Sequence, residues 1–167
     1  SMLRLKEVKF LYGCRGLSLD YVAREPFWSR GLNFDHGTGH GVGYLLNVHE
    51  RPNGIRFRMV PERHDNGVLE AGMITSDEPG LYIEGSHGIR TENLILCVKD
   101  EKNPYGQFMK FEFLTFVPVD KDAVVKELMT ERDIALFNAY HKEVFEKISP
   151  YLEGDEKEWL REATAPI

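Results

Sequence analysis

Apolar residues divide the chain into a helical beginning, a β-rich middle and a helical end. Four segments of the middle are rich in β-branched or aromatic residues and predict strands, namely residues 42–48, 71–77, 88–98 and 108–117. Residues 50–67, between the first two strands, are polar and contain two prolines, which predicts a long loop. Strands followed by helices predict an α+β fold.

The helix before the predicted strands has recognisable start and stop signals. Ser18 is expected to cap a helix that runs toward Trp28. Pro26 is expected to kink or break this helix, and Gly31 supplies a stop signal.

The last third of the chain has helical periodicity. Thr130 and Asp133 form a capping sequence. The apolar residues that follow recur at helical spacing: Ile134, Phe137, Tyr140, Val144 and Ile148. A second short helix is predicted from about Asp155 to just before Pro166. No linker separates these parts, so the sequence predicts one domain.

Composition narrows the class of protein. The 167 residues can form one domain with a core. A net charge of −6 argues against nucleic-acid binding; it suits a site built from carboxylates, although solubility is the simpler reason. Neither a membrane span nor an export signal is evident, so we expect no membrane partner. Cys14 and Cys97 suggest a reducing, cytoplasmic location, and the sequence leaves a bridge between them open.

Histidines alternate with glycines in the segment HGTGHGVG, residues 36–43. Each glycine would cost a helix about 1 kcal/mol, so an extended segment is expected, one that a backbone or ligand approaches closely. On an extended chain, His36 and His40 face one way. His49, in the segment NVHE, has the opposite parity, so the chain must bend or bulge after His40 if both serve one site.

Two glutamates complete the candidate chemistry. In the segment DEPG, the Pro-Gly pair after Glu78 predicts a carboxylate presented at the end of a strand. Glu92, in GIRTEN, is expected inside an apolar strand beside Arg90 on the same face. Simpler interpretations are an Arg–Glu ion pair, structural histidines and an ordinary turn. Together, one His and two Glu with two further His nearby match the ligands of Mn²⁺, Co²⁺ or Zn²⁺.

These segments resemble a known family. LDYVAREPFWSRGLNFDHGTGHGVGYLLNVHE, ITSDEPGLY, GIRTENLILC and the ending from FEFLTFVPVD onward are similar to the Xaa-Pro aminopeptidases of the creatinase and methionine-aminopeptidase superfamily. The resemblance implies an enzyme that releases the N-terminal residue of peptides with proline in second position. It also implies the second half of a pita-bread fold, with an antiparallel curved sheet, flanking helices and a helical C-terminal tail.

The resemblance also implies roles for individual residues. Three would be metal ligands: His40, Glu78 and Glu92. Glu78 would also be the base that activates the attacking water. His36 and His49 would contact the substrate and stabilise the tetrahedral intermediate, and Arg90 would orient the ligands. Two divalent metals are implied, with manganese favoured over zinc or cobalt.

The chain departs from the family pattern upstream. The family takes two further aspartate ligands from D-x-G and D-x-T segments, and nothing in residues 1–35 has that pattern; Asp20 and Asp35 lack the strand context. We therefore expect residues 1–167 to be the C-terminal portion of a metallopeptidase catalytic domain. This portion alone should be inactive and bind at most one metal weakly. Its uncovered apolar surface should lead to a homodimer or to self-association. The alternatives are a non-catalytic peptide- or protein-binding relative, an Xaa-Pro dipeptidase, a methionine aminopeptidase or creatinase, and a purely structural domain.

Overall fold

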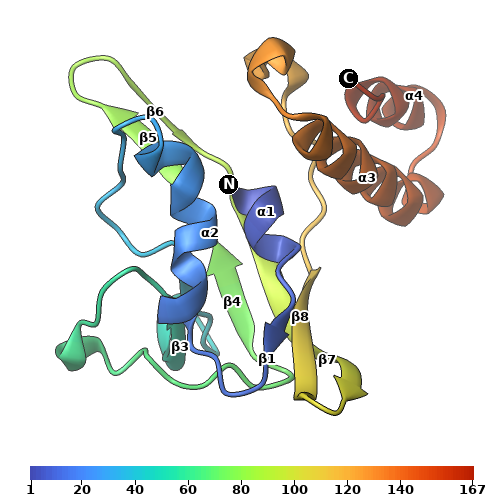
Figure 1. The fold of residues 1–167 in the computed structure, drawn as a ribbon. Coiled ribbons are helices and arrows are strands. Elements are labelled where there is room, and N and C mark those ends of the chain that lie inside the picture. Colours follow the sequence, from blue (N-terminus) through green and yellow to red (C-terminus); the bar gives the residue numbers. More distant parts are fainter. The chain divides into compact units, whose positions relative to one another are not determined.

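The computed structural model describes all of residues 1–167 and divides the chain into two compact units, Ser1–Leu114 and Thr115–Ile167. The chain carries no linker-like sequence at this boundary, which falls within the predicted strand 108–117. Each unit has its own elements, shown in Figure 1.

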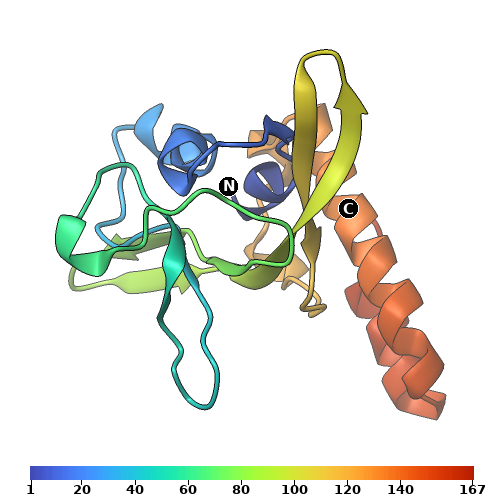
Figure 2. The same ribbon diagram turned by 90° about the horizontal axis from the view of Figure 1, so that it is seen from below.

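The first unit is built on an antiparallel sheet with the strand order β1-β8-β7-β4-β2-β3. Its strands are β1 (Phe10–Leu11), β2 (Gly39–Gly41), β3 (Glu50–Ile55), β4 (Ile74–Asp77), β7 (Asn93–Asn103) and β8 (Gly106–Phe113). Strands β5 (Gly80–Ile83) and β6 (His87–Arg90) form a separate antiparallel hairpin. Helices α1 (Met2–Lys6) and α2 (Gly16–Trp28) lie on one face of the larger sheet (Figures 1 and 2). The predicted α+β class is confirmed.

Alternate residues of the long strands form the core of this unit. Ile95 and Cys97 of β7 are buried, as are Met109 and Phe111 of β8. The ring of Phe111 packs 5.1 Å from that of Phe10. The alternation follows from the strand geometry, which sends successive side chains to opposite faces.

The predicted strand over residues 42–48 is wrong. These residues form the loop between β2 and β3, which projects from the sheet in Figure 2. Tyr44, Leu45 and Leu46 are exposed, and Leu46 is 100% exposed. Their apolar character therefore does not reflect burial in a strand of this chain.

The neighbouring predictions are wrong in part. The first residues of the predicted loop 50–67 form β3, because their backbone pairs with the glycine-rich strand β2. The predicted strand 88–98 is two strands in different sheets, separated at Thr91 and Glu92. The strand expected over 71–77 begins only at Ile74.

Helix α2 begins earlier than predicted and continues through its proline. Its N-cap is Arg15, and Ser18 lies within the first turn, so the predicted Ser18 cap is wrong. Pro26 lies inside the helix, which continues to Trp28. The stop at Gly31 is confirmed: this residue has a φ of 68°, and its N–H donates to the carbonyl of Trp28.

The second unit consists of helices α3 (Glu131–Ile148) and α4 (Gly154–Ala163) with short 3₁₀ turns. The capping sequence of α3 is confirmed, because the Thr130 hydroxyl accepts from the Asp133 N–H while the Asp133 carboxylate accepts from the Thr130 N–H. Phe137 and Val144 are buried on its predicted apolar face. No helix in the structure is both long and apolar enough to span a bilayer.

Candidate functional site

His40 and Glu78 form the centre of the candidate site. His40 lies in the middle of β2, and Glu78 follows the last residue of β4, which confirms the predicted carboxylate at a strand end. His40 Nε2 lies 3.1 Å from Glu78 Oε1, and the two side chains are 15% and 12% exposed. Ser76 closes a ring of hydrogen bonds: its hydroxyl accepts from the His40 N–H and donates to Glu78 Oε1, each at 3.0 Å.

Each side chain of the pair stabilises the charged form of the other. The hydrogen bond to Glu78 raises the pKa of His40 above its usual value, against the opposing effect of burial. Burial pushes the pKa of Glu78 upward, but hydrogen bonds from His40 and Ser76 outweigh it, so the pKa is lowered. His40 Nδ1 donates to the Gly41 carbonyl at 3.0 Å, which directs Nε2 toward the carboxylate.

His49 lies beside His40. Their ring centroids are 4.2 Å apart at an interplanar angle of 63°. The pairing of β2 with β3 shifts register between His40 and Gly41, and the loop that follows brings His49 back to the start of β3. The bend that the opposite parity of these histidines requires is therefore present.

His36 lies outside β2, in an irregular segment. The prediction that His36 and His40 share one face of an extended segment is therefore wrong. Its Nδ1 donates to the Gly37 carbonyl at 2.8 Å, which leaves Nε2 to accept from the Tyr82 hydroxyl at 2.9 Å. Tyr82 lies in β5, immediately after the segment that carries Glu78. His36 therefore faces the β5–β6 hairpin.

Glu92 lies in the joint between β6 and β7, and its side chain is 39% exposed. The prediction that it is buried inside an apolar strand is wrong, because the strand begins one residue later. Arg90 lies between two carboxylates: its Nε is 3.3 Å from Glu92 Oε2, and its Nη1 is 3.8 Å from Glu78 Oε2. The predicted Arg90–Glu92 ion pair is present. Because both side chains are about half exposed, the pair contributes little to the stability of the fold.

The structure does not group all three predicted metal ligands. Among residues 1–167, no cluster of three or more His, Cys, Asp or Glu side chains is arranged to hold a metal. His40 and Glu78 are together, while Arg90 contacts both Glu78 and Glu92. Asp20 is buried against Arg24, and Asp35 is exposed.

Three residues around the pair were not predicted from the sequence. Ser76 contacts Glu78, and Tyr82 contacts His36. Ser76 and Glu78 are two residues apart, so a strand would place them on one face, and this spacing could have indicated Ser76. Asp77 is wholly buried, and neither of its carboxylate oxygens has a hydrogen-bond partner. Burial raises the pKa of Asp77 well above its ordinary value.

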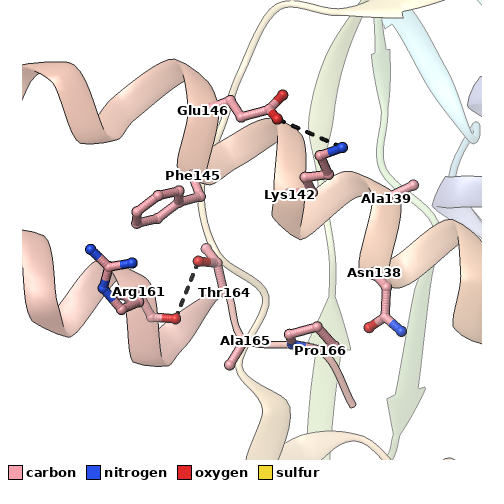
Figure 3. A pocket seen from close by; sticks show the side chains of 9 residues that line it. All are labelled: Asn138, Ala139, Lys142, Phe145, Glu146, Arg161, Thr164, Ala165 and Pro166. Atoms are coloured by element: carbon pink, nitrogen blue, oxygen red, sulfur yellow. Dashed lines mark hydrogen bonds and ion pairs between the residues drawn. The ribbon is translucent and has the colours of Figure 1, made fainter.

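The second unit has a groove of its own, with a volume of about 710 Å³, between α3, α4 and the chain end (Figure 3). Its walls include Phe145 and Pro166, and Lys142 pairs with Glu146 at 3.8 Å along one side. None of the candidate site residues lines it.

Comparison with known protein families assigns this fold to a class of metallopeptidases. Residues 4–99 match the metallopeptidase family M24, and residues 107–167 match the C-terminal region of peptidase M24. The chain belongs to metallopeptidase family M24.

Individual relatives carry more specific names. The "Probable Xaa-Pro aminopeptidase P" of Pyrenophora tritici-repentis is 43% identical over 169 residues, covering 98% of this chain and 28% of the relative. The X-prolyl aminopeptidase of Caenorhabditis elegans, described as a cytosolic enzyme with a di-nuclear active site, matches with a TM-score of 0.85 and 38% identity, over 99% of this chain and 27% of that one. An Xaa-Pro dipeptidase from Bacillus anthracis matches with a TM-score of 0.52 and 34% identity, over 71% of this chain and 29% of that one.

These matches confirm the resemblance to Xaa-Pro aminopeptidases and the antiparallel curled sheet of a pita-bread fold. The chain spans between a quarter and a third of the length of these relatives.

Proposed function

We propose that this chain belongs to a metallo-aminopeptidase that releases the N-terminal residue from peptides with proline in the second position. The structural match to the C. elegans X-prolyl aminopeptidase carries this proposal, because it extends over 99% of the chain and includes the second unit. The dipeptidase from B. anthracis covers only 71% of the chain. A cytosolic location, stated for the C. elegans enzyme, is part of the proposal.

The residues present fit part of a divalent metal site. His40 offers Nε2 while its Nδ1 is held by a backbone carbonyl, which is the usual arrangement of a metal-binding histidine. Glu78 Oε1 lies 3.1 Å from that nitrogen, and Glu92, which pairs with Arg90, would add a second carboxylate. One imidazole and two carboxylates suit manganese, zinc or cobalt, and we propose manganese. Bound metal would lower the pKa of a water molecule and polarise the scissile carbonyl.

The remaining residues would act on the peptide and on protons. Glu78 would accept a proton from the attacking water, since its carboxylate lies at the centre of the site beside His40. His49, beside His40, and His36, held by Tyr82, would contact the substrate carbonyl groups. Arg90, between the two glutamates, would orient them.

Two metals need more ligands than this chain brings together. Since no group of three candidate ligands is formed within residues 1–167, we propose that further carboxylates come from a longer polypeptide. On this view the 167-residue chain alone binds one metal weakly and does not turn over substrate.

We also propose that the protein self-associates or forms a homodimer. Five large apolar side chains are exposed on the β2–β3 loop: Val42, Tyr44, Leu45, Leu46 and Val48. Analytical ultracentrifugation of the chain and of a Leu46→Ser variant tests this, and a concentration-independent monomer would contradict it.

The decisive experiment measures metal and activity in parallel. The 167-residue chain and a polypeptide of the relatives' full length are titrated with Mn²⁺ by calorimetry and assayed with an Xaa-Pro-Xaa peptide and an Xaa-Pro dipeptide. We expect release of the first residue of the tripeptide only by the longer polypeptide, with two metals bound.

Matched variants assign the site. Glu78→Gln should lower turnover of the longer polypeptide by about 100-fold or more, the usual contribution of a general base. Glu84→Gln, in the exposed turn of the neighbouring hairpin, should change turnover less than about twofold. Turnover without metal, or equal losses in both variants, would overturn the proposal, and cleavage of the dipeptide alone would favour an Xaa-Pro dipeptidase.

A further inference from the structure

A fully buried arginine on α2 holds the irregular segment that leads into the site. The side chain of Arg24 is 0% exposed, and its Nε donates to Asp20 Oδ2, one helical turn earlier, at 2.6 Å. Its Nη1 donates to the carbonyl of Phe34 at 2.7 Å, and its Nη2 donates to the carbonyl of His36 at 2.8 Å. The guanidinium therefore fixes the backbone on which His36 stands.

Asp20 extends the same network to Glu78. Its second oxygen, Oδ1, accepts a hydrogen bond from the Thr38 hydroxyl at 2.5 Å, and Thr38 is completely buried. The carbonyl of Thr38 in turn accepts from the N–H of Glu78 at 2.8 Å. One buried ion pair is thus connected to the two segments that carry His36 and Glu78.

Aromatic rings fix the orientation of the guanidinium. Its central carbon lies 3.9 Å from the ring centroid of Phe34 and 4.6 Å from that of Phe57. Arg24 Nη1 also donates to the side chain of Asn33 at 2.8 Å. A planar fork with donors at fixed angles suits these acceptors, and a lysine ammonium would not reach them together.

The network replaces secondary structure. The chain between α2 and β2 forms no helix or strand, and Arg24 supplies the hydrogen bonds that the carbonyls of Phe34 and His36 accept, the first of them buried and the second partly buried. A buried ion pair adds little stability over a well-packed apolar pair, so its main effect here is to select one conformation of this segment.

We propose that Arg24 and Asp20 are positioning residues that hold the backbone at His36 and Thr38, and through Thr38 the backbone at Glu78, in the arrangement the site requires. The structural part of this proposal depends only on the contacts described. Its catalytic part rests on the proposed aminopeptidase function.

Hydrogen exchange tests the structural part directly in the 167-residue chain. In Arg24→Met and in Thr38→Val, the amide of Glu78 should exchange at least about tenfold faster than in the wild type. The amide of Cys97 in β7, which donates to the carbonyl of Met73 just before β4, is the internal reference and should change less than about twofold. Thr38→Val keeps the side-chain shape and the ion pair, so it carries the test if Arg24→Met fails to fold.

Two controls separate positioning from general destabilisation. Arg4→Met breaks the ion pair, at 2.8 Å, between Arg4 of α1 and Glu25, which lies on α2 next to Arg24, and should leave the Glu78 amide unchanged. Leu19→Ala removes buried side-chain volume from α2 and should accelerate both amides together. Unchanged exchange at Glu78 in both Arg24→Met and Thr38→Val would overturn the proposal.

Steady-state kinetics of the longer polypeptide tests the catalytic part. Arg24→Met should lower kcat for an Xaa-Pro peptide by about 100-fold with little change in KM, because a displacement near 1 Å has an effect of this size. Arg24→Lys should not restore kcat. Equal kcat in wild type and Arg24→Met would refute the catalytic part, whereas an inactive wild type would refute the proposed function and leave the exchange result standing.

Discussion

Replacing Gly39 by alanine should disrupt the contact between β2 and β4. A Cβ atom at this position would lie 1.9 Å from the carbonyl oxygen of Ser76 and 3.3 Å from the Thr75 methyl group. Real Cβ atoms essentially never approach closer than 3.0 Å, so the two strands must separate by about 1 Å. The obstacle is backbone, which cannot rotate away as a side chain can.

That separation would break the hydrogen bonds that join the two strands at the site. These are the bond from the His40 N–H to Ser76 at 3.0 Å and the bond from the Glu78 N–H to Thr38 at 2.8 Å. Each contributes about 1 kcal/mol, and overpacking adds about 1–3 kcal/mol. We therefore expect Gly39→Ala to lower the free energy of unfolding of the first unit by about 3–5 kcal/mol.

The assay must report on the first unit alone. Trp28 lies in that unit and Trp159 in the other, so urea denaturation followed by tryptophan fluorescence in a Trp159→Phe background isolates it. Gly37→Ala is the matched control, because its Cβ would meet only the flexible end of Arg56, at 3.0 Å. A loss in Gly39→Ala within about 0.5 kcal/mol of that in Gly37→Ala would refute the reasoning.

Further predictions concern both units. Burial, aided by the charge of Lys121, lowers the pKa of His141 below its usual 6.5, so the unfolded chain binds a proton there more readily than the folded chain does. The free energy of unfolding should therefore fall as the pH drops below about 6.5. Urea denaturation at about pH 7.5 and 5.5 measures this fall, which His141→Gln should reduce. An equal pH dependence in both proteins would contradict this. Burial raises the pKa of Cys97 to about 11, so a thiol reagent should label Cys14 and leave Cys97 unlabelled until denaturation; equal labelling rates in the folded chain would be the contrary result. Thr130→Ala removes the cap of α3 and should lower the stability of the second unit by about 1 kcal/mol, measured by thermal denaturation, and an unchanged midpoint would show that the cap contributes nothing.

Local signals in the sequence predicted the parts of the structure that depend on local chemistry. The capping box of α3 and the stop at Gly31 need only neighbouring residues, and both are present. The Pro-Gly pair placed Glu78 correctly at a strand end, and strand parity correctly required a bend between His40 and His49.

The errors arise where distant backbone decides the outcome. β2 and β3 form because their backbones pair with each other, although β3 is polar and residues 42–48 are more apolar. Asp20 and Arg24, four residues apart on a helix, look in sequence like an ordinary surface pair. Only the tertiary structure shows that the segment after α2 covers them completely.

The two edges of the six-stranded sheet have a consequence for aggregation. β1 is only two residues long, and β3 contains Pro52, which has no N–H to offer a neighbouring strand. An edge that is short or interrupted is a poor template for a strand from another molecule. The folded chain should therefore form cross-β fibrils only slowly in concentrated solution, even though apolar side chains are exposed on the β2–β3 loop.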